Sequence, residues 1–247
     1  MQAKFEMNEG LACLSRILDE LPPESDFWNE AQNRFHFVDR LLMECLGWSA
    51  RSLAYRAESY AQIASLYLRQ ENFQQALRYA RNTLDFNKFH IGARQVLAIV
   101  SRLNANKSNA YRQVETILAI DPLNHFARFE QYLLSESEAV KNLYLKGHRS
   151  ELPHQTTLEL AAVYLELGQE DAALGVLALA PKNPLIELWM AFLTKDHEPS
   201  VSTAHLQKLI DLDLTLVFPY RNETLRMLEW AVQQKDHWQL RYSIALN

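Results

Sequence analysis

The chain has 247 residues, of which 48% are apolar and 22% are charged, and this composition excludes an intrinsically disordered chain. The formal net charge of −5 leaves no basic footprint for nucleic acid, so nucleic-acid partners are not expected. Only six glycines and eight prolines occur, most of them between apolar stretches, so the sequence predicts long helices and no strand.

The two cysteines and the lengths of the apolar runs indicate the cellular compartment in which the protein is expected. Cys13 and Cys45 lie in helical patterns without a disulfide or metal-binding framework, so we expect free, buried thiols. No run approaches the roughly 18 consecutive apolar residues that a membrane span needs, and no signal peptide opens the chain. We therefore expect a cytoplasmic protein without a membrane partner.

The first part of the chain, residues 1–56, predicts irregular helices. A helix is expected near 9–18, a longer one runs from Ser25 to Leu46 and ends at Gly47, and another begins near Ser49.

A periodicity of 34 residues begins at Tyr60. A shift of that length places Ala64 on Ala98 and Ala76 on Ala110. Small side chains at both positions let the two helices of a pair approach closely, while larger apolar residues fill the space beside them. The sequence therefore predicts helix pairs that stack along the chain.

Polar residues mark the ends of the predicted helices. Asn72, with Gln75 three residues later, is typical of a helix start, and Asn124 is placed to cap the helix after Pro122. Gly168 is suited to a left-handed stop between two helices.

Less regular units surround the clear ones. A helix over about 124–134 is followed by one that Ser135 opens with Glu138. Past Pro184 we expect a helix through Trp189 and Phe192, then others over 200–210, from Asn222 to 234, and after a cap at Asp236.

These units resemble the tetratricopeptide repeat family, whose unit is a pair of antiparallel helices of this length. The resemblance implies an all-α fold, a right-handed α-α superhelix (TPR-like solenoid) of antiparallel helix pairs. It implies one continuous solenoid with irregular helical repeats at 1-56, four repeats in 57-184 (57-90, 91-124, 125-153 and 154-183), and truncated C-terminal helical repeats at 185-247.

Four longer stretches, at 84–103, 119–134, 151–184 and 216–246, resemble the helical half of large bacterial proteins. Those proteins carry an N-terminal β-rich domain of uncharacterised function, reminiscent of sugar-mutarotase folds. The resemblance implies a fragment of a larger protein, whose partner is a protein, a peptide or another domain of the same full-length chain. The N-terminal region departs from the pattern, because Asp39 and Arg40 replace an expected leucine and small residue.

In the tetratricopeptide family the first helix of each pair lines the concave surface. Carried over position by position, this implies a binding face at Ala61, Ser65, Leu68, Gln95, Ile99, Arg102, Phe126, Phe129, Leu133, Leu158 and Ala162. Phe126 and Phe129 are the candidate apolar anchors, with Gln95 and Arg102 as a polar rim. The alternative is that both aromatics only tighten the stacking of the helices.

No residue pattern indicates catalysis. The eight histidines lack metal-ligand spacing, no glycine-rich phosphate loop occurs, and neither cysteine lies in a nucleophile signature. We therefore predict a non-enzymatic interaction scaffold with no catalytic residue, cofactor or metal.

Two other interpretations stay open. The resemblance also allows an accessory or carbohydrate-binding module, for which Trp28 beside Asn29, Glu30, Gln32 and Asn33 is the nearest approach to a sugar cleft. The loop residues Tyr220 and Arg221 face a partner or clamp onto neighbouring helices.

Overall fold

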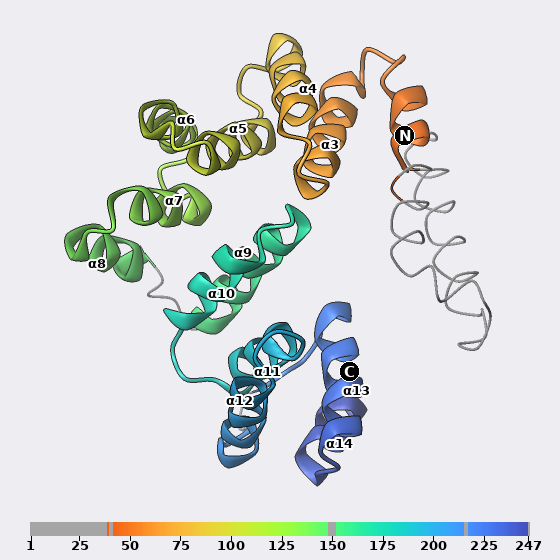
Figure 1. Cartoon of the computed structure of the whole chain (residues 1–247). Coiled ribbons are helices and arrows are strands. Elements are labelled where there is room, and N and C mark those ends of the chain that lie inside the picture. Colours follow the sequence, from red (N-terminus) through yellow and green to blue (C-terminus); the bar gives the residue numbers. More distant parts are fainter. Residues whose placement is uncertain (1–38, 40–41, 148–151, 215–216, 247) are drawn as a thin grey trace. The chain divides into compact units, whose positions relative to one another are not determined.

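The structure, a computed structural model, describes residue 39 and residues 42–147, 152–214 and 217–246 (Figure 1). The chain divides into two units, Met1–Ile120 and Asp121–Asn247, and each is described by itself. All regular secondary structure of the described residues is helical. The expected all-α repeat fold of antiparallel helix pairs is therefore confirmed. The repeat boundaries stay a prediction.

Unit 1 consists of helix pairs that pack on each other. Residues 42–49 are helical, and four longer helices follow: α3 (Arg56–Arg69), α4 (Phe73–Phe86), α5 (Ile91–Leu103) and α6 (Lys107–Ile120). Helix α3 packs against α4, and α5 packs against α6. The first helices of the two pairs, α3 and α5, also contact each other, as stacked pairs require.

Unit 2 also consists of helix pairs. Its helices are α7 (His125–Ser135), α8 (Glu138–Gly147), α9 (Pro153–Glu166), α10 (Glu170–Ala178), α11 (Pro184–Thr194), α12 (Pro199–Asp211), α13 (Asn222–Gln234) and α14 (Trp238–Ala245). The helices pack in pairs: α7 with α8, α9 with α10, α11 with α12, and α13 with α14. Helix α11 contacts both α9 and α13, so the first helices of successive pairs again lie side by side.

The predicted small residues lie in the core of unit 1. Ala64, Ala76, Ala98 and Ala110 are completely buried. A larger side chain at any of them would push paired helices apart, because close helix approach depends on small residues at the contact. The 34-residue periodicity of small residues thus follows from the close packing of the paired helices.

A left-handed residue turns the chain between the two helices of a pair. Glu71, Ala105, Glu136 and Gly168 all have positive φ angles, between 52° and 70°. At three of these turns the next residue's N–H bonds to the carbonyl five residues earlier, as in Asn72 to Tyr67 (2.8 Å). Gly168 was predicted from its lack of a side chain, whereas the other three turns accept the strain of a Cβ atom.

Several predicted helix starts are confirmed. The Asn72 side chain accepts a hydrogen bond from the Gln75 N–H (3.3 Å), and Asn124 accepts one from the Ala127 N–H (3.0 Å). Each bond satisfies an N–H group that the first turn of a helix leaves unpaired.

Three other predicted boundaries are wrong. The helix over 42–49 passes through Gly47. Ser135 is the last residue of α7, and α8 begins only at Glu138, because Glu136 adopts the left-handed conformation that ends α7. Helix α14 is capped by His237, while Asp236 instead pairs with Arg241.

The expectation of buried thiols fails at Cys45, which is free and exposed. Cys13 and the long helix predicted from Ser25 lie outside the described residues, as does the group around Trp28.

Candidate interaction surfaces

The structure divides the predicted binding face into buried and partly exposed positions. Six of its residues are buried: Ala61, Leu68, Ile99, Phe126, Phe129 and Leu158. Five are partly exposed: Ser65, Gln95, Arg102, Leu133 and Ala162. The buried positions belong to the packing between helices, so only the second group offers atoms to a partner.

The two candidate aromatic anchors pack inside unit 2. Phe129 is 0% exposed, and its ring centroid lies 5.2 Å from that of Tyr144 and 5.6 Å from that of Tyr164. Phe126 stacks on Tyr164 at 5.2 Å. The Tyr164 hydroxyl donates to the fully buried carboxylate of Glu130 (2.9 Å). This burial supports the alternative interpretation, in which both aromatics join α7 to α8 and α9.

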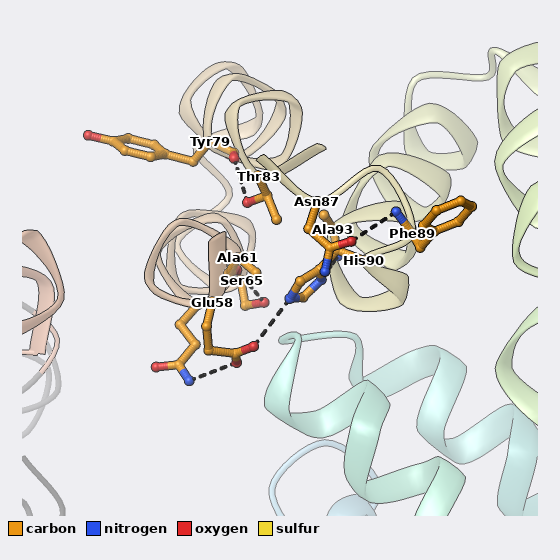
Figure 2. A network of polar contacts seen from close by, with 10 residues as sticks. Glu58, Ala61, Ser65, Tyr79, Thr83, Asn87, Phe89, His90 and Ala93 are labelled. Atoms are coloured by element: carbon orange, nitrogen blue, oxygen red, sulfur yellow. Dashed lines mark hydrogen bonds and ion pairs between the residues drawn. The ribbon is translucent and has the colours of Figure 1, made fainter. Parts of the chain in front are cut away.

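In unit 1 a polar network joins α3 to the start of α5 (Figure 2). His90 precedes α5, and its Nδ1 atom accepts a hydrogen bond from the Ala93 N–H (3.2 Å). The proton of the neutral ring must then lie on Nε2, which donates to Glu58 Oε2 on α3 (3.2 Å). One histidine therefore caps α5 and links it to the preceding pair.

The sequence leaves room for this histidine. A Cβ atom on Gly92 would lie 3.2 Å from His90 Cε1, so the absence of a side chain there lets the ring sit over the first turn of α5. Glu58 also accepts a hydrogen bond from Gln62 (3.1 Å). This network was missed in the sequence, because histidine is not among the usual capping residues.

In unit 2 a loop forms hydrogen bonds with two side chains of α9. The Tyr220 hydroxyl donates to Gln155 Oε1 (3.1 Å), and Arg221 Nη2 donates to Glu159 Oε1 (3.0 Å). Both acceptors lie on α9, more than 60 residues before the loop. The clamp interpretation of Tyr220 and Arg221 is therefore confirmed, and both side chains of α9 are bound by the chain itself.

Asp39 also has a structural partner. It is buried, pairs with Arg69 Nη2 and accepts a hydrogen bond from Gln70 Nε2 (3.2 Å) at the end of α3. A carboxylate in place of the expected leucine thus anchors the preceding segment to α3.

A surface that the sequence did not reveal lies at one edge of unit 1. We call it the aromatic–cation edge: contacts join Trp48, Arg51, Arg56 and Phe86, and Lys88 and Phe89 follow Phe86 in the turn after α4. The Arg51 guanidinium lies 3.8 Å from the Trp48 ring centroid, and Arg56 lies 5.2 Å from that of Phe86. Arg56 also donates to the carbonyls of Ala50 (2.8 Å) and Arg51 (3.2 Å), which ties the turn before α3 to the end of α4.

A cavity of about 420 Å³ lies between α12, α13 and the turn before α12. Its lining includes the Trp230 ring, the carboxamides of Gln207 and Gln234, and the carboxylate of Asp196. Lys235 Nζ donates to Gln207 Oε1 (2.5 Å), and the Trp230 ring meets Phe192 nearly at right angles with centroids 5.4 Å apart.

Burial shifts the pKa of three groups in unit 2. Burial lowers the pKa of His125, against the opposing effects of Asp121 and Glu159, and it lowers the pKa of His154. Burial also raises the pKa of Tyr144. Among the described residues no three histidine, cysteine, aspartate or glutamate side chains are grouped to hold a metal ion. None of the described helices combines the length and apolar character that a membrane crossing requires.

Comparison with known proteins found no matching family model and no matching curated protein. Solved structures with partial similarity include the MamA RS-1 ArsTM double mutant, at 14% identity and a TM-score of 0.36, covering 77% of this chain and 94% of that one. A tetratricopeptide repeat protein from Parabacteroides merdae has 15% identity and a TM-score of 0.39, with 87% and 96% covered. Naa15/Naa10 bound to HypK-THB has 14% identity and a TM-score of 0.35, with 85% of this chain and 37% of that chain covered.

Proposed function

We propose that this chain is a non-enzymatic scaffold that holds a protein partner on the α3–α5 side of unit 1. The observation that carries the proposal is the contrast between two equivalent faces. On α3 and α5, the predicted positions Ser65, Gln95 and Arg102 are partly exposed. On α9, the predicted position Ala162 is also partly exposed, but two other side chains of that helix, Gln155 and Glu159, are bonded to the Tyr220–Arg221 loop.

The chemistry of the α3–α5 face suits recognition of a polypeptide. Gln95 offers both a donor and an acceptor, and the carboxylate of Glu58 is held in place by His90. Groups that are fixed before binding lose less conformational entropy when a partner arrives. The partner is either a separate protein or another domain of a longer chain.

The proposal is tested with a photo-crosslinking amino acid in the cell. The crosslinker replaces Gln95 on α5 in one variant and Gln74, which is exposed on α4, in the control. We expect a discrete crosslinked protein, or a crosslink within the longer chain, from position 95 and none from position 74. Equal crosslinking from both positions, or none from position 95, would contradict the proposal.

A second candidate function is the binding of an oligosaccharide in the α12–α13 cavity. The lining combines an aromatic ring with carboxamides and a carboxylate, which are the groups that stack on a sugar ring and bond its hydroxyls. Its volume of about 420 Å³ lies within the range of small-molecule sites.

Calorimetric titration of the whole chain with a panel of neutral and acidic oligosaccharides tests this candidate. Binding should disappear in Trp230→Ala and persist in Trp238→Ala, which removes an exposed tryptophan away from the cavity lining. The absence of binding by every sugar, or equal loss in both variants, would exclude it.

A further inference from the structure

The aromatic side chains at the aromatic–cation edge of unit 1 are largely exposed to water, which is unfavourable for apolar groups. Trp48 is 66% exposed, Phe86 52% and Phe89 64%. Scattered apolar residues on a surface need no explanation, but grouped aromatics next to arginine are typical of interaction sites. The contacts of Arg51 and Arg56 connect Trp48 to Phe86, so at least these two rings belong to one surface.

The residues that define the edge carry positive charge only, although the exposed Asp85 directly precedes Phe86. Segments 48–56 and 86–89 contain Arg51, Arg56 and Lys88 and no carboxylate. Within the described part of the chain, no ion pair joins any of these three cations to an acidic side chain. The charges are instead placed over aromatic rings, with Lys88 Nζ 5.7 Å from the Phe89 centroid. Rings and cations are thus presented together.

The edge is held in position before any partner binds. Arg56 is fixed by two backbone carbonyls, and the Phe89 N–H bonds to Asn87 Oδ1 (3.1 Å) in the turn between α4 and α5. Figure 2 shows Phe89 directed away from the His90 network, so the two features are separately available. A rigid aromatic surface binds at a lower entropic cost than a mobile one.

We propose that the aromatic–cation edge binds an acidic protein segment that also carries aromatic or large aliphatic side chains. Carboxylates of the segment complement Arg51 and Arg56, and its apolar side chains cover Trp48 and Phe86. The inference rests on the proposed scaffold function and specifies the partner's chemistry. A nucleic acid would also complement the cations, but its affinity depends on many phosphate contacts and the edge offers only a few cations.

The test begins with selection from a displayed library of random peptides, with the whole chain as bait. Enriched peptides should contain both carboxylates and aromatic or large aliphatic residues. Their affinity, measured by fluorescence polarisation, should fall about tenfold or more in Trp48→Ala and in Arg51→Ala/Arg56→Ala. It should also fall as salt is raised, because exposed charges are screened.

Matched controls keep the test specific. Trp238→Ala removes a tryptophan with the same exposure, 66%, and Arg81→Ala removes an exposed arginine of α4, so both should leave peptide affinity unchanged. Far-UV circular dichroism of each variant checks that the helices persist. A single-stranded RNA oligonucleotide serves as the competing ligand.

Three results would overturn the inference: no enrichment, enrichment of peptides without carboxylates, or binding that the edge variants do not weaken. RNA binding that depends on the same residues and exceeds peptide binding would also overturn it. If the crosslink from position 95 persists in these cases, only the inference fails. If that crosslink is also missing, the scaffold function fails with it.

Discussion

At the scale of single residues, the 34-residue period is carried by hydrogen bonds as well as by packing. Arg94 donates to the carbonyl of Lys88 (2.6 Å), and Arg128, 34 residues later, donates to that of Pro122 (3.3 Å). His90 and Asn124 cap successive first helices in the same way, although their side chains differ. Successive repeats therefore place a side-chain hydrogen-bond acceptor at the same helix start, although the residue type differs.

The left-handed turns give a prediction at this scale. Glu71 has φ 58°, a conformation that costs a residue with a Cβ atom roughly 1–2 kcal/mol relative to the right-handed region. We expect Glu71→Gly to stabilise unit 1 by about 0.5–1 kcal/mol, because glycine removes that strain but loses more entropy on folding. Urea unfolding measures the change.

The neighbouring substitution provides the control. Glu71→Ala keeps the Cβ atom and should give no comparable gain in the free energy of unfolding. An equal gain in both variants would show that the glutamate side chain, not the backbone, is responsible.

Sequence reasoning found some of these residues and missed others for a physical reason. Asn72, Asn124 and Gly168 are of the types that caps and left-handed turns favour, so they were predicted. His90 and Glu71 perform the same tasks with less suitable side chains. For His90, only its distance of 34 positions from Asn124 indicated a cap.

At the scale of helices, buried polar contacts join the first helices of neighbouring pairs. Trp189 on α11 is completely buried, and its indole N–H donates to Thr224 Oγ1 on α13 (3.1 Å). Because a hydrogen bond is directional, this contact fixes the orientation of α13 against α11 more closely than apolar packing alone would. It fixes α13 against the preceding pair.

This contact gives the second prediction. Thr224→Val keeps the size of the side chain but leaves the buried indole N–H without its acceptor, so unit 2 should lose about 1–3 kcal/mol of stability. Thr224→Ser keeps the hydroxyl and should lose less. Urea unfolding of both variants decides, and an equal loss would mean that the methyl group matters and the hydrogen bond does not.

The positions of helices along the chain could be predicted more closely than the exposure of individual side chains. Helices α11 and α12 were placed closely by Pro184, Trp189 and the turn before Ser200. The burial of Phe129 and the covering of Gln155 depend on residues that are distant in the chain, such as Tyr164 and Tyr220. The spacing of apolar residues contains no information on such contacts.

At the scale of the molecule, the aromatic–cation edge differs in charge from the chain as a whole. The chain has a net charge of −5, yet Arg51 and Arg56 at the aromatic–cation edge have no carboxylate partner among the described residues. An acidic partner is repelled by the molecule as a whole and attracted at this edge, which favours one orientation of approach.

The two units should also differ in their response to pH. His125 and His154 lie in unit 2, and burial lowers the pKa of both below the ordinary value of about 6.5. The unfolded chain then binds more protons than the folded one, so their stabilising contribution is complete above about pH 6.5 and is lost as the pH falls below it.

We therefore expect urea unfolding of unit 2 to shift to lower urea between about pH 7.5 and pH 5.5. The double variant His125→Gln/His154→Gln should show a smaller shift over the same interval. A shift of the same size in the double variant would assign the pH dependence to other groups.

The central claim is that unit 1, rather than unit 2, presents the surface that holds the partner. Hydrogen–deuterium exchange of the whole chain, alone and bound to the protein crosslinked from position 95, tests it most directly. We expect slower exchange in segments 58–65 and 90–102, which form the α3–α5 face, and unchanged exchange in α13 and α14. Protection confined to α13 and α14, or to the outer helices α4 and α6, would contradict it.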